Sequence, residues 1–260
     1  MLRLCQDGVV VVTGGTSGVG EAIARTVARE GAVGIVVAGR DRERGAAVAA
    51  ALAGPNCSAE FVPAHLEDPD DCRAVVRRAV ERFGRVDALV NSAADTARST
   101  LDETTPAFFD RMMAVNVRAP MLTMQEAIRD MRRRRAPGAI VNILSTSAHG
   151  GQPHLCAYST SKGALATLTR NVAHAHRRDR IRVNGLCLGW TDTPHEDRVQ
   201  RSFHGRAPGW LAEAEAATPM GRLVKPAEVA EMVALLLSDR VGVVTGSLVE
   251  FSQDVLGGAD

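Results

Sequence analysis

The stretch GVVVVTGGTSGVG, Gly8 to Gly20, decides the fold of this 260-residue chain. Its apolar, β-branched first half predicts a fully buried strand. The segment EAIARTVAREG follows, with apolar residues at helical spacing up to Gly31. Gly14, Gly18 and Gly20 let the backbone turn tightly and approach a phosphate, which the positive end of the helix attracts. A phosphate-binding turn is therefore predicted, and the alternative is a plain connection between strand and helix.

The rest of the chain alternates short apolar runs with amphipathic segments. Strands are expected at 34–39, 60–63, 86–91, 139–144, 181–186 and 248–251, and helices at 42–53, 68–83, 106–115, 118–135, 157–176 and 226–237. This alternation predicts an α/β fold, a doubly wound parallel sheet with helices on both faces. Because the chain has no repeat, linker or low-complexity tract, residues 1–260 are expected to form one domain.

Composition excludes several classes of protein. A net charge of +1 gives no reason to expect nucleic acid or an anionic membrane as a partner. The five scattered cysteines form no CxxC pair, so neither a disulfide framework nor a metal site is expected. The seven residues before the first strand are too few for a signal peptide, and no apolar run reaches membrane-spanning length. We therefore expect a cytoplasmic protein.

A second stretch, STSAHGGQPHLCAYSTSK from Ser145 to Lys162, holds the only tyrosine, Tyr158, and one of two lysines. Tyr158 and Lys162 are four residues apart, so a helix places them on one face. An ammonium beside a phenol favours the phenolate and lowers its pKa, which suits proton transfer. The alternative is a surface pair on an amphipathic helix.

The strand at 34–39 is followed by Arg40 and Asp41, twenty residues beyond Gly20. An acidic residue in this region would bind the ribose 2′-hydroxyl of NAD, whereas an arginine can pair with the 2′-phosphate of NADP. NADP(H) is therefore favoured and NAD(H) remains possible. Arg40 could also be an ordinary solvated charge.

Several motifs in the same order occur in the single-domain branch of the short-chain dehydrogenase/reductases, which the chain resembles over nearly its whole length. The matching residues are TGGTSGVG at 13–20 for TGxxxGxG, NSAA at 91–94 for NNAG, Asn116 for the catalytic asparagine, Ser145 with Tyr158 and Lys162 for the serine and the YxxxK pair, GWTDTP at 189–194 for the segment that holds the nicotinamide, and PMGRLVKPAEVAEMVALLLS at 219–238 for the helix after the substrate lid.

The resemblance implies a Rossmann-like sheet of seven strands in the order 3-2-1-4-5-6-7, and it implies roles. Tyr158 is the acid in ketone reduction and the base in alcohol oxidation. Lys162 lowers its pKa and holds the nicotinamide ribose. Ser145 steadies the substrate oxygen, and Asn116 bends a helix and holds a water in a proton relay.

Cofactor contacts are implied at both edges of the expected cleft. The residues are Gly14, Thr16, Ser17, Gly18, Val19, Gly20, Arg40, His65, Leu66, Asn91, Ala93, Tyr158, Lys162, Gly189, Thr191 and Thr193. Several features depart from the family, among them Leu188-Gly189 in place of Pro-Gly before the lid and FSQDVLGG at 251–258 in place of DGG. His65 replaces the aspartate that meets the adenine, so it is either a cofactor contact or a surface residue. Ala94 replaces the last glycine of NNAG, and the glycine loop lacks the basic residue of many NADP users.

The span 192–218 is expected to be the substrate lid. It carries His195, Glu196, Arg198, Arg201, His204 and Trp210, and the loop after Ser145 adds His149, Gln152 and His154. These polar side chains favour a polyol, sugar or cyclitol over a steroid or acyl chain. The alternatives are a 3-oxoacyl or other small-ketone reductase and a catalytically silent dinucleotide-binding regulatory protein. An extended-branch nucleotide-sugar epimerase or dehydratase is disfavoured, because its TGxxGxxG spacing and extra C-terminal domain are lacking.

An assembly is also expected. In the family, the helices that begin near Arg118 and Ala157 pack against copies of themselves. The second carries a small and apolar series, Ala164, Leu165, Leu168 and Val172, which suits close helix packing. A homotetramer is therefore predicted, and the alternative is that this face only covers the sheet.

Overall fold

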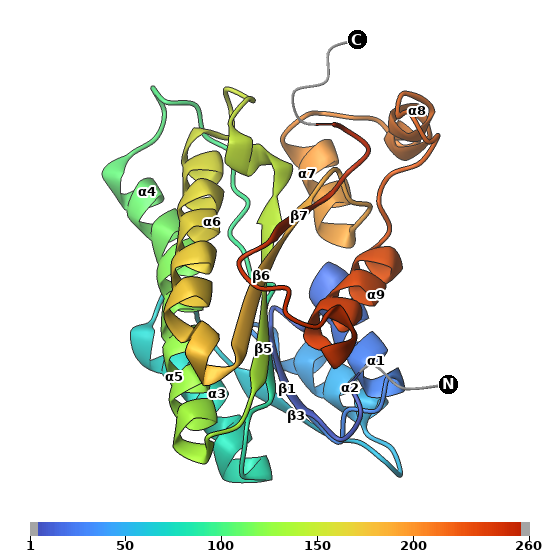
Figure 1. Cartoon of the computed structure of the whole chain (residues 1–260). Helices are drawn as coiled ribbons and strands as arrows, with labels where there is room; N and C mark the ends of the chain where they lie inside the picture. Colours follow the sequence, from blue (N-terminus) through green and yellow to red (C-terminus); the bar gives the residue numbers. More distant parts are fainter. Residues whose placement is uncertain (1–4, 256–260) are drawn as a thin grey trace.

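Seven parallel strands form one sheet in the order β3-β2-β1-β4-β5-β6-β7 in the computed structural model, which describes residues 5–255 (Figure 1). The strands are β1 Val9–Thr13, β2 Gly34–Gly39, β3 Ser58–Pro63, β4 Ala88–Asn91, β5 Gly138–Ser145, β6 Ile181–Leu188 and β7 Leu248–Phe251. The predicted fold class and strand order are confirmed. All seven predicted strands are present, with ends shifted by at most two residues.

The centre of the sheet is apolar and closed to water. Every residue of β1 is buried, and in its register Val10 lies opposite Ile35 on one side and Ala88 on the other. The order in which strands are added to the sheet changes side between β1 and β4: β2 and β3 follow β1 on one side, and β4 to β7 extend the sheet on the other. In open parallel sheets, a crevice for ligands forms at the carboxyl ends of the strands beside this change of side.

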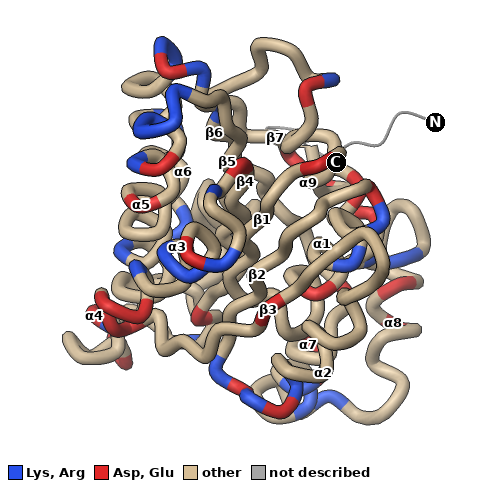
Figure 2. The backbone as a smooth tube through the Cα atoms, turned by 90° about the horizontal axis from the view of Figure 1, so that it is seen from below, with Lys and Arg blue, Asp and Glu red and all other residues tan. Residues whose placement is uncertain are grey.

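Helices cover both faces. One face is packed by α1 Gly18–Arg29, α2 Arg42–Leu52 and α9 Pro226–Leu237, and the other by α3 Pro69–Phe83, α5 Ala119–Arg134 and α6 Cys156–His176 (Figures 1 and 2). Two apolar cores fill the spaces between helices and sheet. Among the described residues, no helix is both long and apolar enough to cross a bilayer.

Two features interrupt this pattern. The helix α4 Pro106–Met113 continues into α5 through a π-helical turn, Ala114–Arg118, where sequence periodicity predicted two separate helices. The span predicted as a lid folds into α7 Pro194–Ser202 and α8 Trp210–Ala216, which lie beyond the carboxyl edge of the sheet (Figure 1). As predicted, the lid contains no strand among its described residues.

Candidate active site

The glycine loop between β1 and α1 is built for close backbone contact. Gly14 has φ +66°, and a Cβ atom there would lie 2.7 Å from the Cα of Ala93. A Cβ on Gly20 would lie 2.2 Å from the carbonyl oxygen of Gly14. Gly18 also has a positive φ, +53°. Only glycine fits this path without strain, so the loop brings its backbone against the β4 end and the start of α1.

The first turn of α1 fits an anionic group. Ser17 occupies the N-cap position with extended backbone, and its side chain makes no capping hydrogen bond. A helix start that lacks a side-chain cap retains N–H groups and a positive dipole for a ligand. Thr16 is buried beneath the loop, where a Cβ on Gly39 would meet its Oγ1 at 2.6 Å. The cradle therefore suits a dinucleotide pyrophosphate, as the sequence predicted.

Two charged residues follow β2, and they differ in whether the side chain already has a protein partner. Asp41 caps α2, accepting the backbone N–H of Arg44 at 3.0 Å and its guanidinium at 2.5 Å. Arg40 is exposed, and no hydrogen bond or ion pair to its side chain occurs within residues 5–255. Of these two neighbours, the guanidinium rather than the carboxylate is therefore available to a nucleotide ribose.

Three other predicted cofactor residues have different surroundings. His65 is exposed, and its backbone N–H donates to Asp71 at 2.7 Å. Leu66 is buried in the core below it. Asn91 is also buried, and its amide donates to Asn142 Oδ1 at 2.9 Å. The side chain of Asn91 thus serves the core of the sheet, so only its backbone can contribute to a cofactor site.

Tyr158 and Lys162 lie one turn apart on α6, as predicted. The Nζ of Lys162 lies 5.7 Å from the centroid of the Tyr158 ring. It donates to the carbonyl oxygen of Ile143 in β5 at 2.8 Å, and only 2% of the residue is exposed. Burial disfavours the ammonium and lowers the pKa of Lys162 to about 8. The ammonium and neutral amine forms of Lys162 are therefore about equally populated near pH 8.

Tyr158 is half-buried beside the end of β5, where its hydroxyl forms a hydrogen bond with Ser145. Burial raises the pKa of Tyr158 above its ordinary value, and the charge of Glu196 adds to the increase. The bond to Ser145 and the charge of Arg98 act in the opposite direction. The expectation that the protein lowers this pKa through Lys162 is therefore wrong for the protein's own residues, because loss of solvation outweighs the nearby positive charge.

Asn116 lies at the centre of the π-helical turn and is completely buried. Its Oδ1 accepts the backbone N–H of Asp95 at 2.7 Å, and its Nδ2 donates to the Asp95 carbonyl at 2.8 Å and to Ser161 Oγ at 3.0 Å. Asn116 thus joins the loop after β4 to α6, and a π-helical turn lies where the resemblance implied a bend. The amide is occupied by protein groups, so its role in a proton relay stays a prediction.

The segment after β6 faces the glycine loop. Thr193 caps α7 by accepting the backbone N–H of Glu196 at 3.1 Å. Its methyl group lies 3.6 Å from the position of a Cβ on Gly18. Thr191 forms a parallel β-bridge with Val224, and its hydroxyl donates to the Gly189 carbonyl at 2.9 Å. The predicted nicotinamide segment therefore lies against the glycine loop.

One loop, residues 95–99, was missed by sequence reasoning. It connects β4 to α4 and brings Asp95 to Asn116 and Arg98 to the lid, where Arg98 Nη2 lies 3.4 Å from Glu196 Oε2. The motif at 91–94 ends just before this loop, so spacing gave no signal for it. The burial of Arg98 depends on its contact with the lid, so it could not be predicted from the loop's own sequence.

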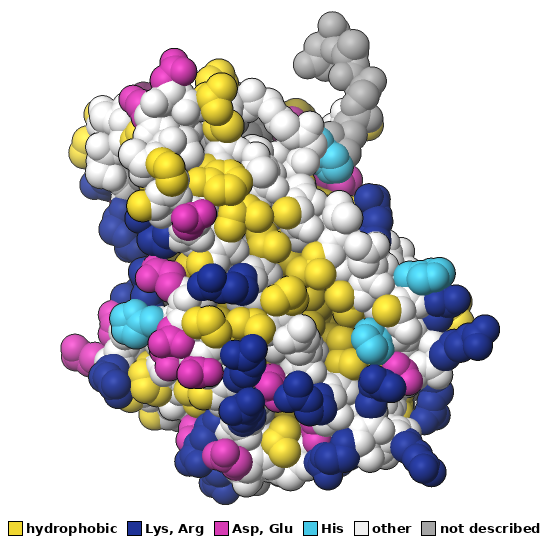
Figure 3. Space-filling model, turned by 90° about the vertical axis from the view of Figure 1, so that its left-hand side faces the viewer, with side chains coloured by type: hydrophobic (Ala, Val, Ile, Leu, Met, Phe, Trp, Pro, Cys, Tyr) yellow, Lys and Arg dark blue, Asp and Glu magenta, His cyan; other side chains and the backbone are white. Residues whose placement is uncertain are grey.

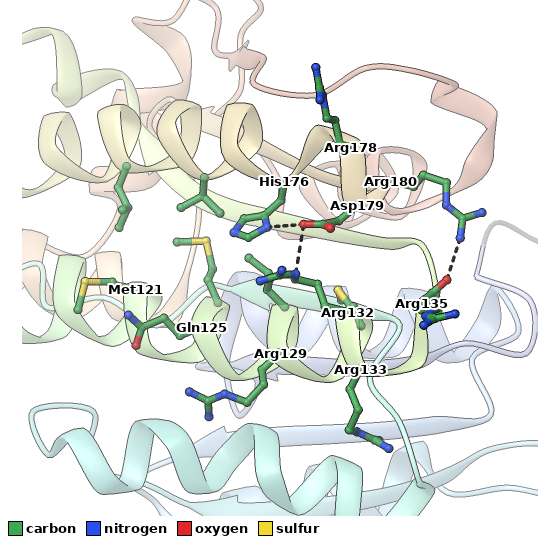
Figure 4. A pocket seen from close by; sticks show the side chains of 16 residues that line it. Met121, Gln125, Arg129, Arg132, Arg133, Arg135, His176, Arg178, Asp179 and Arg180 are labelled. Atoms are coloured by element: carbon green, nitrogen blue, oxygen red, sulfur yellow. Dashed lines mark hydrogen bonds and ion pairs between the residues drawn. The ribbon is translucent and has the colours of Figure 1, made fainter.

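A large groove lies elsewhere, between α5 and α6. It encloses about 990 Å³ and contains none of the four predicted catalytic residues. Apolar side chains gather along it in Figure 3, and Figure 4 shows Met121 and Gln125 among its lining with arginines along its rim. Arg132 and His176 both contact Asp179 across one end, at 3.5 and 2.8 Å. This groove is therefore a surface feature, separate from the crevice.

Comparisons with known proteins agree with this geometry. A sequence family described as enoyl-(acyl carrier protein) reductase matches residues 14–252. Cis-4-hydroxycyclohexanecarboxylate dehydrogenase of Sinomonas cyclohexanicum is 35% identical over 92% of this chain and 93% of its own. 2-(S)-hydroxypropyl-CoM dehydrogenase 3 of Xanthobacter autotrophicus is 35% identical over 95% of this chain and 96% of its own. A solved structure of a short chain dehydrogenase/reductase family protein superposes with a TM-score of 0.81, at 33% identity, over 96% of this chain and 97% of that one.

Proposed function

The chain belongs to the short-chain dehydrogenase/reductase family and is an oxidoreductase that acts on CH–OH groups; we propose that it interconverts a secondary alcohol and a ketone on a polyol, sugar or cyclitol with NADP(H) as the favoured cofactor. The observation that carries the proposal is the convergence of Ser145, Tyr158 and Lys162 at the carboxyl end of β5. The names of both relatives given above are those of dehydrogenases of hydroxylated compounds, which supports the reaction class.

NADP(H) supplies hydride transfer to and from the carbinol carbon when it is bound. The backbone of the glycine loop and the first turn of α1 would hold its pyrophosphate, since both fit an anionic group. Lys162 would hold the nicotinamide ribose, and Thr191 and Thr193 would border the nicotinamide. Arg40 would pair with the 2′-phosphate, which its unoccupied guanidinium supports.

Proton transfer falls to Tyr158. In ketone reduction its hydroxyl donates a proton to the carbonyl oxygen, while the Ser145 hydroxyl donates a hydrogen bond to the same oxygen. A raised pKa keeps Tyr158 protonated at neutral pH, which suits the acid role. In oxidation the phenolate must accept the proton, so the rate of oxidation is expected to rise with pH.

The substrate pocket supports a polar ligand. His195 Nε2 lies 2.6 Å from Thr96 Oγ1, and His154 and His204 pack edge to face with ring centroids 5.4 Å apart. Burial and nearby arginines lower the pKa values of His195 and His204, so both imidazoles are neutral at pH 7. Neutral imidazoles donate and accept hydrogen bonds, which suits the hydroxyl groups of a polyol or sugar.

The groove between α5 and α6 supports a homotetramer. Leu168 and Val172, from the series predicted to pair with another copy, line this groove, whereas Leu165 of the same series packs into the core. An apolar groove rimmed by charges is typical of an interface between subunits. Light scattering is expected to give four chains, and a monomer at micromolar concentration would contradict the assembly. The five free cysteines support a reducing compartment such as the cytoplasm.

A turnover screen tests the reaction. NAD(H) and NADP(H) would each be combined with polyols, sugars, cyclitols and their ketones, and nicotinamide absorbance would be followed. We expect turnover of a secondary alcohol or its ketone. Binding of the cofactor with no turnover of any member would contradict the proposal and favour a silent dinucleotide-binding protein.

A further inference from the structure

Arg98 lies in the β4–α4 loop with most of its side chain covered. Only 12% of that side chain is exposed, although it carries a permanent charge. Nη1 donates to the Thr96 carbonyl at 2.8 Å, and Nη2 reaches Glu196 Oε2 at 3.4 Å. Its Nε is buried and has no hydrogen-bond partner in the part of the chain that the structure describes. A buried N–H group without a partner costs about 1–3 kcal/mol, so this guanidinium has unused binding capacity.

The backbone holds Arg98 close to the reacting groups. The next residue, Ser99, donates its N–H to the His154 carbonyl at 2.9 Å and pairs in parallel with Leu155. Leu155 begins the turn that leads into α6, three residues before Tyr158. The charge of Arg98 accordingly acts on the Tyr158 hydroxyl as well as on His195 and His204. Arg98 therefore faces the space that a substrate of Tyr158 would occupy.

Glu196 does not saturate this arginine. Its Oε1 accepts Trp190 Nε1 at 2.8 Å and Gln200 Nε2 at 2.7 Å, so the lid itself satisfies that oxygen. Only Oε2 contacts Arg98, by one long hydrogen bond, whereas arginine and carboxylate pair most strongly through two short ones. The arrangement leaves hydrogen-bonding capacity on the guanidinium for a second carboxylate.

A simpler interpretation is that the two residues form a latch between the lid and the β4–α4 loop. A latch would be strongest with a close, two-pronged pair, and it would gain nothing from an N–H group left buried without a partner. Both features instead suit a group that binds an oxygen-rich ligand. The carboxylate that already lies beside Arg98 shows which ligand chemistry the fork accepts.

We propose that Arg98 binds a carboxylate of the substrate, so that the enzyme acts on a hydroxy acid and its oxo acid. This inference rests on the proposed function and narrows its polar substrate to one with an acidic group near the reacting carbinol. Glu196 competes for the same guanidinium and thereby sets the affinity. No bond of the carboxylate changes during the reaction, because the group serves only to position the substrate.

Matched pairs of substrates test the proposal. The panel comprises gluconate with glucitol, 3-hydroxybutanoate with butane-1,3-diol, and 3-oxobutanoate with 3-oxobutanamide, each with NADP(H) and NAD(H). We expect the acid of a pair to have the higher kcat/KM. Arg98→Gln should raise KM for the acid about 10- to 100-fold, the equivalent of one charge-assisted hydrogen-bond pair, and change KM for the neutral partner less than about threefold. Glu196→Gln should lower KM for the acid.

Arg111→Gln is the matched control. Arg111 pairs with Asp95 of the same loop at 3.0 Å, but its side chain is 43% exposed. It should affect both members of a pair equally. Equal turnover of acid and neutral partners, or an equal loss for both in Arg98→Gln, would overturn the inference and leave the proposed reaction standing. An increase of KM for the acid in Glu196→Gln would also overturn it. No turnover of any member would overturn the proposed function and this inference together.

Discussion

The chain's two lysines lie in two regions that treat the same side chain in opposite ways. Lys162, in the core, is 2% exposed, bonds a main-chain carbonyl, and has a pKa lowered to about 8 by burial. Lys225, at the base of the lid, is partly exposed and bridges Asp192 at 2.9 Å and Glu215 at 2.6 Å. Hydrogen bonds to these carboxylates raise its pKa. The ammonium of Lys162 thus loses its proton easily, whereas that of Lys225 stays charged and links two carboxylates.

The same contrast extends to the neighbours of each lysine. Around Lys162, Asn116 is held by main-chain groups of Asp95, which cannot change rotamer. The lid has a main-chain bond to the segment that follows it, from the Asp192 N–H to the Val224 carbonyl at 2.9 Å, and otherwise relies mainly on side chains, as where Trp210 Nε1 donates to Asp197 at 2.8 Å. Main-chain contacts fix the reacting groups in place, and side-chain contacts permit a lid to move or to be remodelled for another substrate. Changes in the core should therefore alter the chemical step, whereas changes in the lid should alter substrate binding.

Removing the Tyr158 hydroxyl should have the largest effect. Tyr158→Phe keeps the ring and loses the proton donor, so turnover should fall about 10²- to 10⁴-fold while folding and cofactor binding survive. Steady-state kinetics and cofactor titration measure both. With no other tyrosine in the chain, the phenolate absorbance near 295 nm reports this residue alone, and it should titrate at higher pH than free tyrosine in the cofactor-free protein. Retention of most activity would contradict the catalytic role.

Lys162→Met should abolish most turnover, by about 10²-fold, yet stabilise the fold. The folded pKa of Lys162, about 8, lies below the ordinary 10.5, so folding disfavours the ammonium. As pH rises from 8 to 10.5 the unfolded chain binds more protons than the folded one, and wild-type stability gains from this group. At pH 7 that gain is absent, so the variant should be more stable by about 1–3 kcal/mol.

The difference between variant and wild type should then shrink as pH rises towards 10.5. Urea unfolding at pH 7 and pH 10 measures it, and the comparison cancels every other titrating group that the two chains share. A variant less stable than wild type at pH 7 would mean that the hydrogen bond to Ile143 outweighs the cost of burying the charge. Lys162→Arg would not rescue turnover, because a wide guanidinium cannot replace a compact ammonium.

Sequence reasoning predicted most of the fold because its signals are local. The valine run of β1, the glycine at 84 that ends α3 with φ 79°, and Pro69 at the start of that helix each specify their own conformation. The π-helical turn at 114–118 was not predicted, since the changed repeat of a π turn interrupts the apolar pattern and indicated two separate helices. Its cause is tertiary, because Asn116 there bonds a loop 21 residues earlier.

In the site too, residues placed by local sequence patterns could be predicted, and properties that depend on tertiary packing could not. Gly14 and Gly20 could be found from one strand–turn–helix pattern, and Tyr158 with Lys162 from helical spacing, whereas Ser145 on a different element was identified through the family resemblance. The direction of the pKa shift at Tyr158 could not, since it depends on how much solvent the surrounding elements exclude. Arg98 was missed for a related reason: its significance comes from the lid, about a hundred residues later, as the contact with Glu196 shows.

Arg40→Ala tests an exposed side chain that has no partner among residues 5–255, and its effect should be smaller. Loss of one charge-assisted pair with the 2′-phosphate should weaken NADP(H) binding about tenfold and leave NAD(H) nearly unchanged. Titration of both cofactors by nicotinamide fluorescence measures the two dissociation constants. Arg82→Ala, an exposed arginine at the end of α3, is the control and should change neither. A preference for NAD(H) in wild type, or one that Arg40→Ala leaves intact, would refute the assignment of Arg40.

Lys225→Met should have the smallest effect, confined to the lid. It removes the clamp between Asp192 and Glu215, so KM should rise a few-fold while kcat changes little, because the reacting groups keep their main-chain contacts. Since a raised lysine pKa keeps the clamp charged up to and beyond pH 10, the effect should be constant between pH 6 and 9. Added salt should reproduce part of it in wild type, because screening weakens exposed ion pairs.

The chain's two tryptophans make the lid visible in this test. Trp190, just before the lid, and Trp210, within it, stack with ring centroids 6.0 Å apart, so intrinsic fluorescence reports the lid and the segment that leads into it. Lys225→Met should change the emission, whereas Tyr158→Phe should not. Arg222→Met removes a neighbouring cation that pairs with Glu228 instead, and it should leave the emission and KM unchanged. A fall in kcat as large as that of Lys162→Met would show that the lid also shapes the reacting groups, and the division between core and lid would fail.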